Sequence, residues 1–243
     1  MLYAILGFGL HMFFLARYVY LVRGLGWYLL SLFIYFPYFY IYWGLIQIRY
    51  AAGISFLLLG LMAKKNINRY VFFVIAVSFH NTMLLPALLY LIFYQIKNMT
   101  IKLLLVPILI ALAVFGISFT RYKEKYSDYG MESFGYLSGN MVLLYCFCIL
   151  FFFFRGDIID KFKDRIINTY LVVIVLLLWV LFFNLIMPIV ANRFLTLNIF
   201  LAAICCLFIK NKYYWILMTL LVFLFSIWNL EVLILRENEV FTP

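Results

Sequence analysis

The chain has 243 residues, of which 69% are hydrophobic, 22% aromatic and only 12% charged. A soluble domain is closer to half apolar, so this composition excludes an ordinary soluble protein and predicts an integral membrane protein. The net charge of +10 is then explained by basic cytoplasmic loops and not by a nucleic-acid partner. Because no linker or soluble segment interrupts the apolar runs, we expect one integral membrane domain spanning 1–243.

The apolar residues form continuous runs. They therefore predict an all-α, polytopic transmembrane helical bundle and not a barrel, whose strands would alternate in polarity. We expect about nine to ten hydrophobic segments. In chain order the runs are 2–15, 27–45, 50–63, 70–94, 103–119, 136–154, 169–190, 194–209 and 213–230. An outer loop at about 120–135 and a cytoplasmic loop at about 155–166 separate the later runs.

The run 70–94 has two interpretations, a single long span or two short helices broken at His80-Asn81-Thr82. Asn and Thr are common N-caps, and Pro86 falls where the first turn of a second helix tolerates proline. A single span distributes the 19 basic residues 10 against 9 between the two membrane faces, whereas a break distributes them 13 against 6. Only the second arrangement satisfies the positive-inside rule, so we predict a re-entrant hairpin around residue 80.

This arrangement places several polar side chains on the outer face. Arg49 begins a helix at the outer boundary, His80 lies at the turn, and Arg193 is expected in a short turn after Pro188. Guanidinium groups bind phosphate bidentately, and histidine can accept a proton from a hydroxyl group. Each residue also has a structural alternative, because arginine at a membrane boundary anchors headgroups and histidine bonds neighbouring helices.

Two further patterns bear on metal and redox chemistry. Asp157 and Asp160 alone do not form a metal site, because hard cations require several converging oxygen ligands. All four cysteines lie inside apolar runs, where we expect them to fill the core or face lipid, without disulfides or metal. They are Cys146, Cys148, Cys205 and Cys206.

Two segments carry a family resemblance. Ile48-Arg49-Tyr50-Ala51-Ala52-Gly53, followed about thirty residues later by Ala76-Val77-Ser78-Phe79-His80-Asn81-Thr82, resembles the EpsG-type, Wzy-class family of polysaccharide polymerases. The segment from Arg121-Tyr122 to Tyr126 resembles the family's tyrosine-rich outer loop, and Asn192-Arg193-Phe194 resembles its late arginine motif. Tyr50 departs from the usual glutamine. Family members also carry an earlier loop with an Arg-Gly-Asp-Tyr-like motif, so we expect this chain to lack an N-terminal part, which would leave it inactive alone.

The resemblance implies a GT-C-like, metal-independent glycosyltransferase without cofactors, in the bacterial inner membrane. It would transfer an undecaprenyl-pyrophosphate-linked glycan onto a lipid-linked repeat unit at the periplasmic face, in the assembly of polysaccharides such as O-antigen. The implied partners are membrane lipids, a chain-length regulator and a flippase, with no nucleic acid. The implied roles are pyrophosphate binding by Arg49, Arg121 and Arg193, positioning or proton acceptance by His80, and contact with the acceptor hydroxyl by Asp128 and Glu132.

Two other classes of function remain open from the residues alone. The first is a lipid-linked oligosaccharide flippase or another polytopic transporter, although such proteins often show internal repeats and charge along the path. The second is a membrane acyltransferase, which would also use histidine and arginine. Beyond His80 the chain offers only His11, which stands alone in the first run.

Overall fold

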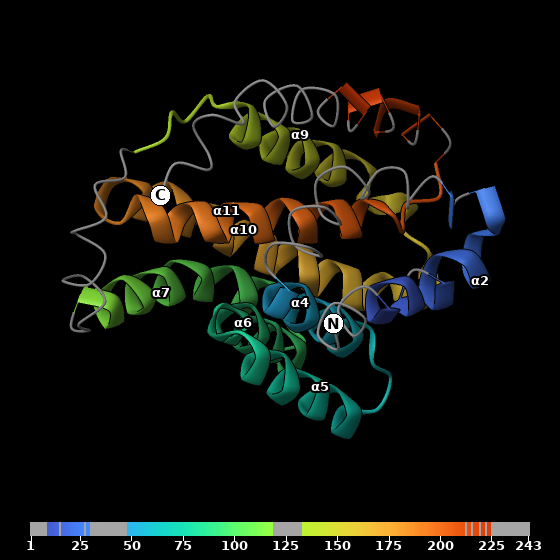
Figure 1. Ribbon diagram of the computed structural model, residues 1–243, viewed down its shortest axis with the longest axis horizontal. Coiled ribbons are helices and arrows are strands. Elements are labelled where there is room, and N and C mark those ends of the chain that lie inside the picture. The colour runs from blue at the N-terminus through green and yellow to red at the C-terminus, as the bar shows by residue number, and fades with distance from the viewer. Residues whose placement is uncertain are drawn as a thin grey trace. The chain divides into compact units, whose positions relative to one another are not determined.

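The computed structural model describes residues 9–14, 16–26, 28–29, 48–118, 133–211, 213–214, 216–218, 220–221 and 223–224. Within these ranges the chain is helical, with short connecting turns and one isolated antiparallel bridge between Ile158 and Ile209. The all-α prediction is therefore confirmed for the described part of the chain (Figure 1).

The described helices follow one another with short connections. In chain order they are η1 (Ala16–Tyr20), α2 (Leu21–Arg23), α4 (Ile48–Met62), α5 (Asn66–Phe79), η3 (Asn81–Met83), α6 (Leu84–Gln95), α7 (Met99–Ser118), α9 (Gly139–Phe154), η4 (Arg155–Asp157), η5 (Asp160–Phe162), α10 (Lys163–Ile186) and α11 (Pro188–Cys206).

Three of the described helical segments are long and apolar enough to cross a membrane, as the composition predicts. They are Gly139–Asp157, Asp160–Ile186 and Pro188–Cys206. Four shorter apolar helices also occur among the described residues, Arg49–Met62, Asn66–Phe79, Asn81–Gln95 and Met99–Leu109. These lengths identify the chain as a membrane protein, because about 20 apolar residues cross the hydrocarbon core of a bilayer.

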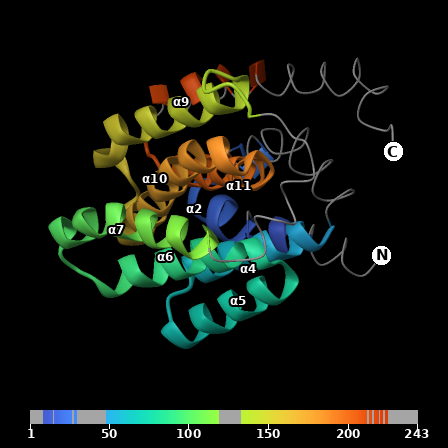
Figure 2. The same cartoon turned by 90° about the vertical axis from the view of Figure 1, so that its left-hand side faces the viewer.

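The chain forms two compact units, Met1–Leu84 with Asn211–Pro243 (unit 1) and Leu85–Lys210 (unit 2). In unit 1, α4 and α5 pack as an antiparallel hairpin, which Figure 2 shows as two adjacent helices. Phe56 stacks on Phe79 with ring centroids 5.6 Å apart. Gly60 allows the ring of Phe73 to approach the α4 backbone. Aromatic rings and missing Cβ atoms thus fix the register of this hairpin.

In unit 2, α10 and α11 form the central antiparallel pair, and α9 packs against α11. Trp179 of α10 packs edge-on against Phe194 of α11, with ring centroids 4.5 Å apart. Further along the pair, Asn198 Nδ2 donates to the carbonyl of Val173 over 3.0 Å. Such a bond between neighbouring helices stabilises a buried amide donor, to which lipid offers no alternative partner.

The two ends of unit 2 differ sharply in charge. Lys102 of α7 bonds Asn168 of α10, and backbone hydrogen bonds join the 155–162 segment to the end of α11. These contacts gather seven basic residues at one end, namely Lys97, Lys102, Arg155, Lys161, Lys163, Arg165 and Lys210. At the other end, Phe134 is hydrogen-bonded to Asn184. Arg193 is the basic residue that the structure describes there.

The helix boundaries confirm one expected break and reveal a second that was not expected. The run 70–94 is indeed two helices, because α5 ends at Phe79 and α6 begins at Leu84. Whether this turn is re-entrant in a membrane stays a prediction. The run 169–190 was expected to be uninterrupted, and this is wrong. Met187 leaves the helical conformation, with φ −146° and ψ 73°, and Pro188 starts α11, since proline is favoured in a first helical turn.

Candidate functional site: the His80 break in the α4–α5 hairpin

The α5 helix ends at His80, which adopts an extended backbone with φ −155° and ψ 123°. Its ring then caps the following 3₁₀ turn, because Thr82 N–H donates to Nδ1 over 3.4 Å. The Thr82 hydroxyl lies 2.7 Å from the same nitrogen. The cap is therefore the histidine itself, and not Asn81 or Thr82 as their capping preferences suggest. His80 therefore interrupts the helix, and its imidazole is held by the turn that follows.

Gly53 allows α4 to approach this break closely. A Cβ atom at residue 53 would lie 3.2 Å from the carbonyl oxygen of Ala76, 3.2 Å from Met83 Cγ and 3.4 Å from His80 Cβ. The carbonyl oxygen belongs to the α5 backbone and cannot yield as a flexible side chain does. Gly53 is thus a site residue that the motif contained but to which sequence reasoning gave no role. Its signal was a glycine in an otherwise apolar helix.

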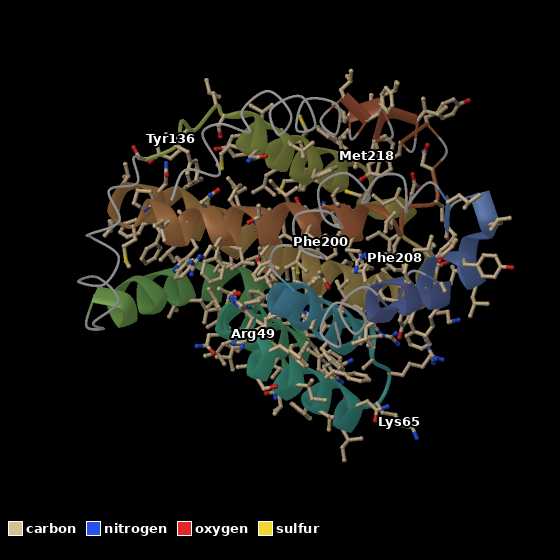
Figure 3. All side chains as sticks on the ribbon, viewed as in Figure 1. Arg49, Lys65, Tyr136, Phe200, Phe208 and Met218 are labelled. Carbon is tan, nitrogen blue, oxygen red and sulfur yellow. The ribbon has the colours of Figure 1, made fainter. Side chains whose placement is uncertain are left out.

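Two further α4 residues surround the imidazole. Tyr50 is buried and packs edge-on against His80, with ring centroids 5.0 Å apart and planes at 88°. Arg49 is exposed and precedes Gly53 by four residues, so both lie on one face of α4, about 6 Å apart along its axis. The antiparallel hairpin thus has Arg49, near the start of α4, and His80, which follows α5, at the same end. Figure 3 shows Arg49 at the end of the hairpin opposite the turn that contains Lys65.

Among the described residues of unit 1, the charge at this end is positive. The described residues of unit 1 contain no aspartate or glutamate, and the first carboxylate of the chain is Glu124. Lys64 and Lys65 lie exposed at the opposite end of the hairpin, and Arg69 is buried there. Among the residues that the structure describes, Arg49 is therefore the basic residue at the His80 end of the α4–α5 hairpin. A guanidinium and an imidazole in a unit whose described residues include no carboxylate suit the binding of an anion, phosphate above all.

Arg193 occupies a different setting from the one expected. It lies exposed in unit 2, inside the second turn of α11, and not in a short interhelical turn. The reason is that the chain reverses at Met187, and Pro188 starts a helix that continues without interruption through Arg193. The Thr196 hydroxyl donates to the Arg193 carbonyl over 3.1 Å, which is a bond within the helix.

Three predicted site residues, Arg121, Asp128 and Glu132, lie outside the described residues. The aspartates of the loop at about 155–166 are described, and Asp160 pairs with Lys210 over 2.8 Å at an exposed position. No cluster of three or more possible metal ligands occurs within the described ranges.

The cysteines lie in or beside the packed interior of unit 2. Cys148, Cys205 and Cys206 are buried, Cys146 is half-buried, and all four are free thiols. Cys205 Sγ lies 3.9 Å from the carbonyl of Ile166, a contact within the packed interior of unit 2. They fill space between helices.

Sequence reasoning missed three polar residues that organise the helices. Arg69 is 1% exposed, and its guanidinium donates to the carbonyl of Ala63 at the end of α4. Asn184 binds both backbone groups of Phe134, accepting over 3.1 Å and donating over 2.7 Å. Asn168 accepts from Lys102 over 2.6 Å. The signal for Asn184 was a lone amide in an apolar run.

The comparisons with known proteins agree with the motifs of this hairpin. No curated protein and no solved structure shows significant similarity to the chain. The model of the EpsG family matches residues 1–241, which is almost the whole chain and includes both α4 and the His80 break. This family is associated with polysaccharide polymerases of the glycosyltransferase type. The match over nearly all residues shows that the chain belongs to the EpsG family.

Proposed function

We propose that the chain extends a bacterial surface polysaccharide at the outer face of the inner membrane. The donor is a glycan chain on undecaprenyl pyrophosphate, and the acceptor is a hydroxyl group of a lipid-linked repeat unit. The acceptor oxygen forms a bond to the anomeric carbon of the donor glycan. The bond from that carbon to the pyrophosphate oxygen breaks, and its electron pair leaves with undecaprenyl pyrophosphate. The hydroxyl proton passes to a base.

The observation that carries this proposal is the end of the α4–α5 hairpin that contains Arg49 and His80, in an EpsG family member. Arg49 begins α4 and His80 ends α5 at this end, in a unit whose described residues lack carboxylates. We assign Arg49 to the donor pyrophosphate, because a guanidinium binds two phosphate oxygens at once. Its charge would also stabilise the leaving pyrophosphate, the role that a metal ion fills in other transferases.

The other predicted residues keep their proposed roles. Arg121 and Arg193 are further candidates for binding pyrophosphate, and Asp128 and Glu132 are candidates for accepting the hydroxyl proton. A flippase that delivers repeat units and a chain-length regulator are the expected protein partners. Undecaprenyl-pyrophosphate-linked oligosaccharide is the expected lipid substrate.

The test replaces Arg49 in the full chain and measures polysaccharide length. The host is the native strain with its own copy of the gene deleted, complemented from a plasmid. We expect Arg49→Ala to reduce polymerisation by about a hundredfold, since removal of one charge-stabilising donor costs that much or more. Arg49→Lys should recover only part, because lysine cannot bind bidentately. Lys64→Ala and Lys65→Ala, at the other end of the same hairpin, are the matched controls and should retain full length.

The same strains separate a polymerase from a flippase. Loss of a polymerase leaves single repeat units at the cell surface, whereas loss of a flippase leaves none. A surface ladder of normal length in the Arg49→Ala strain would exclude this arginine from the reaction. Absence of all surface repeats in the deletion strain would favour the transporter.

A further inference from the structure

Lys102 is a buried cation between two helices of unit 2. It is the fourth residue of α7, it is 8% exposed, and its Nζ donates to Asn168 Oδ1 of α10 over 2.6 Å. An ammonium group has three N–H donors, and Asn168 is the one hydrogen-bond partner that the described residues give it. Because the amide of Asn168 is neutral, this bond uses one donor and leaves the positive charge without a counter-ion in contact.

The neighbouring carboxylate does not reach this charge. Asp164 lies one turn before Asn168 on α10 and acts on Lys102 electrostatically, but no ion pair joins the two side chains in the described part of unit 2. Asp164 is itself exposed, between Lys163 and Arg165 in the chain. A buried charge is destabilising unless an oppositely charged group contacts it. The setting of Lys102 therefore favours an anion within hydrogen-bond reach of Nζ.

Two helix N-termini add to the positive field around Lys102. The helix α7 begins at Met99 and α10 begins at Lys163, and the bond between Lys102 and Asn168 holds these two beginnings side by side. The N-terminus of a helix dipole favours negative charge and disfavours positive charge, yet the first turn of α7 contains no acidic residue. An anion beside Lys102 would stabilise both the ammonium group and the helix end.

The exposed surface of α7 favours a lipid over a free ion as the source of this anion. Four apolar side chains next to Lys102 along α7 are 47% to 64% exposed, namely Ile101, Leu103, Leu104 and Ile108. In a membrane helix such side chains face acyl chains, which a phospholipid supplies and a free phosphate does not. This end of unit 2 also has seven basic and three acidic described residues, and such an excess attracts anionic lipid headgroups.

We propose that Lys102, at the joined beginnings of α7 and α10, binds the headgroup phosphate of an anionic phospholipid whose acyl chains lie along the exposed face of α7. Asn168 is the positioning residue that orients the ammonium group. The positive-inside rule assigns this lipid to the cytoplasmic leaflet. The inference is independent of the proposed function, because it uses neither Arg49 nor His80.

The first experiment removes the charge of Lys102 and measures lipid binding. The full-length chain is purified in a neutral detergent, freed of lipid and titrated with phosphatidylglycerol, while the midpoint of thermal unfolding is followed. We expect Lys102→Gln to raise the half-saturating lipid concentration at least about tenfold, since a buried hydrogen bond to a charged group is lost. Lys97→Gln, the same change at an exposed lysine just before α7, is the matched control. It should change that concentration by about twofold or less, and equal effects in both variants would overturn the site.

The second experiment leaves Lys102 in place and supplies a counter-ion from within the protein. Asn168→Asp puts a carboxylate of the same shape beside Nζ, where it neutralises the ammonium group and repels a phosphate. We expect it to weaken phosphatidylglycerol binding about as much as Lys102→Gln does. Lys102→Arg should bind within about threefold of the parent, because a guanidinium group also binds phosphate. These two variants test the site even if Lys102→Gln does not fold, and parental affinity in Asn168→Asp would contradict the proposal.

The same titration of the parent with phosphatidylcholine and with inorganic phosphate identifies the source of the anion. We expect phosphatidylglycerol to raise the unfolding midpoint at concentrations at which neither of the other two compounds does. Equal stabilisation by inorganic phosphate would show a site for a free anion and overturn the assignment to lipid. Equal stabilisation by phosphatidylcholine would show that acyl chains alone stabilise the protein, and Lys102 would then have no part in lipid binding.

Discussion

Arg69 and Arg49 are two arginines of one hairpin with opposite environments. Arg69 is 1% exposed, and it donates from Nη2 to the Ala63 carbonyl over 2.6 Å and from Nη1 to Asn66 Oδ1 over 3.0 Å. It thus provides a hydrogen-bond donor at the end of α4, where the last carbonyl groups have no partner within the helix. Arg49 is exposed. Burial and partners, which the residue type alone does not reveal, separate a structural arginine from a candidate ligand.

Removing the Arg69 guanidinium should destabilise the hairpin without changing its charge pattern at the His80 end. Arg69→Met keeps the apolar stem but leaves the Ala63 carbonyl buried and unpaired. We expect a loss of about 2–4 kcal/mol in the free energy of unfolding, from two hydrogen bonds to a charged group. Reversible unfolding in mixed detergent and SDS micelles measures it. Lys65→Met, at an exposed position of the same turn, is the control. Equal stability of the two variants would contradict the capping role.

At the scale of the helix pair, α4 and α5 are held together by close backbone approach. A Cβ atom at residue 60 would lie 2.5 Å from the ring of Phe73, which is 3% exposed. Gly53 makes a similar approach at the other end, against a backbone carbonyl. Small residues permit such approach in membrane helices, where packing replaces the hydrophobic effect between apolar surfaces.

Gly60→Ala should therefore destabilise the protein, although alanine is the better helix former. Overpacking costs about 1–3 kcal/mol, against a propensity gain of about 1 kcal/mol. Gly26→Ala, where a Cβ meets nothing within 4 Å, should be neutral or stabilising. The second substitution Phe73→Leu should recover part of the loss in Gly60→Ala, which a double-mutant cycle in the same micelles detects. Additive effects would show that the two residues are not in contact.

For the whole molecule, the charge asymmetry of unit 2 predicts its orientation. The end that contains the 155–165 segment has seven described basic residues and three acidic ones, while the opposite end has Arg193. The positive-inside rule places the basic end in the cytoplasm. The 119–132 segment, which follows α7 in the chain, has three basic and three acidic residues and so adds no net charge.

Cysteine labelling tests this orientation. In a background with the four native cysteines replaced by alanine, Lys161→Cys and Leu137→Cys place single exposed thiols at the two ends of unit 2. A membrane-impermeant maleimide should label residue 137 in intact spheroplasts and residue 161 only in inverted vesicles. Labelling of both residues from the same side would rule out a membrane-crossing arrangement of unit 2.

The amino-acid sequence alone determined the class of the protein and much of its local structure. Continuous apolar runs require helices in a membrane, and His80-Asn81-Thr82 followed by Pro86 interrupts the run 70–94 where α5 ends. The two motifs of the hairpin also pointed to the EpsG family, which the match over residues 1–241 shows. These features are local, since each depends on residues within a few turns of one another.

Only the tertiary structure decided how these segments meet. The register that brings Gly53 against His80 depends on Phe56, Phe79, Gly60 and Phe73 packing across two helices, and no spacing in the chain encodes it. The capping of the 3₁₀ turn by the His80 ring depends on the orientation of the Thr82 amide. The helical place of Arg193 follows from where the chain turned at Met187. Hydropathy is a property of composition, whereas contacts between helices depend on shape and direction, and these appear only when the helices pack.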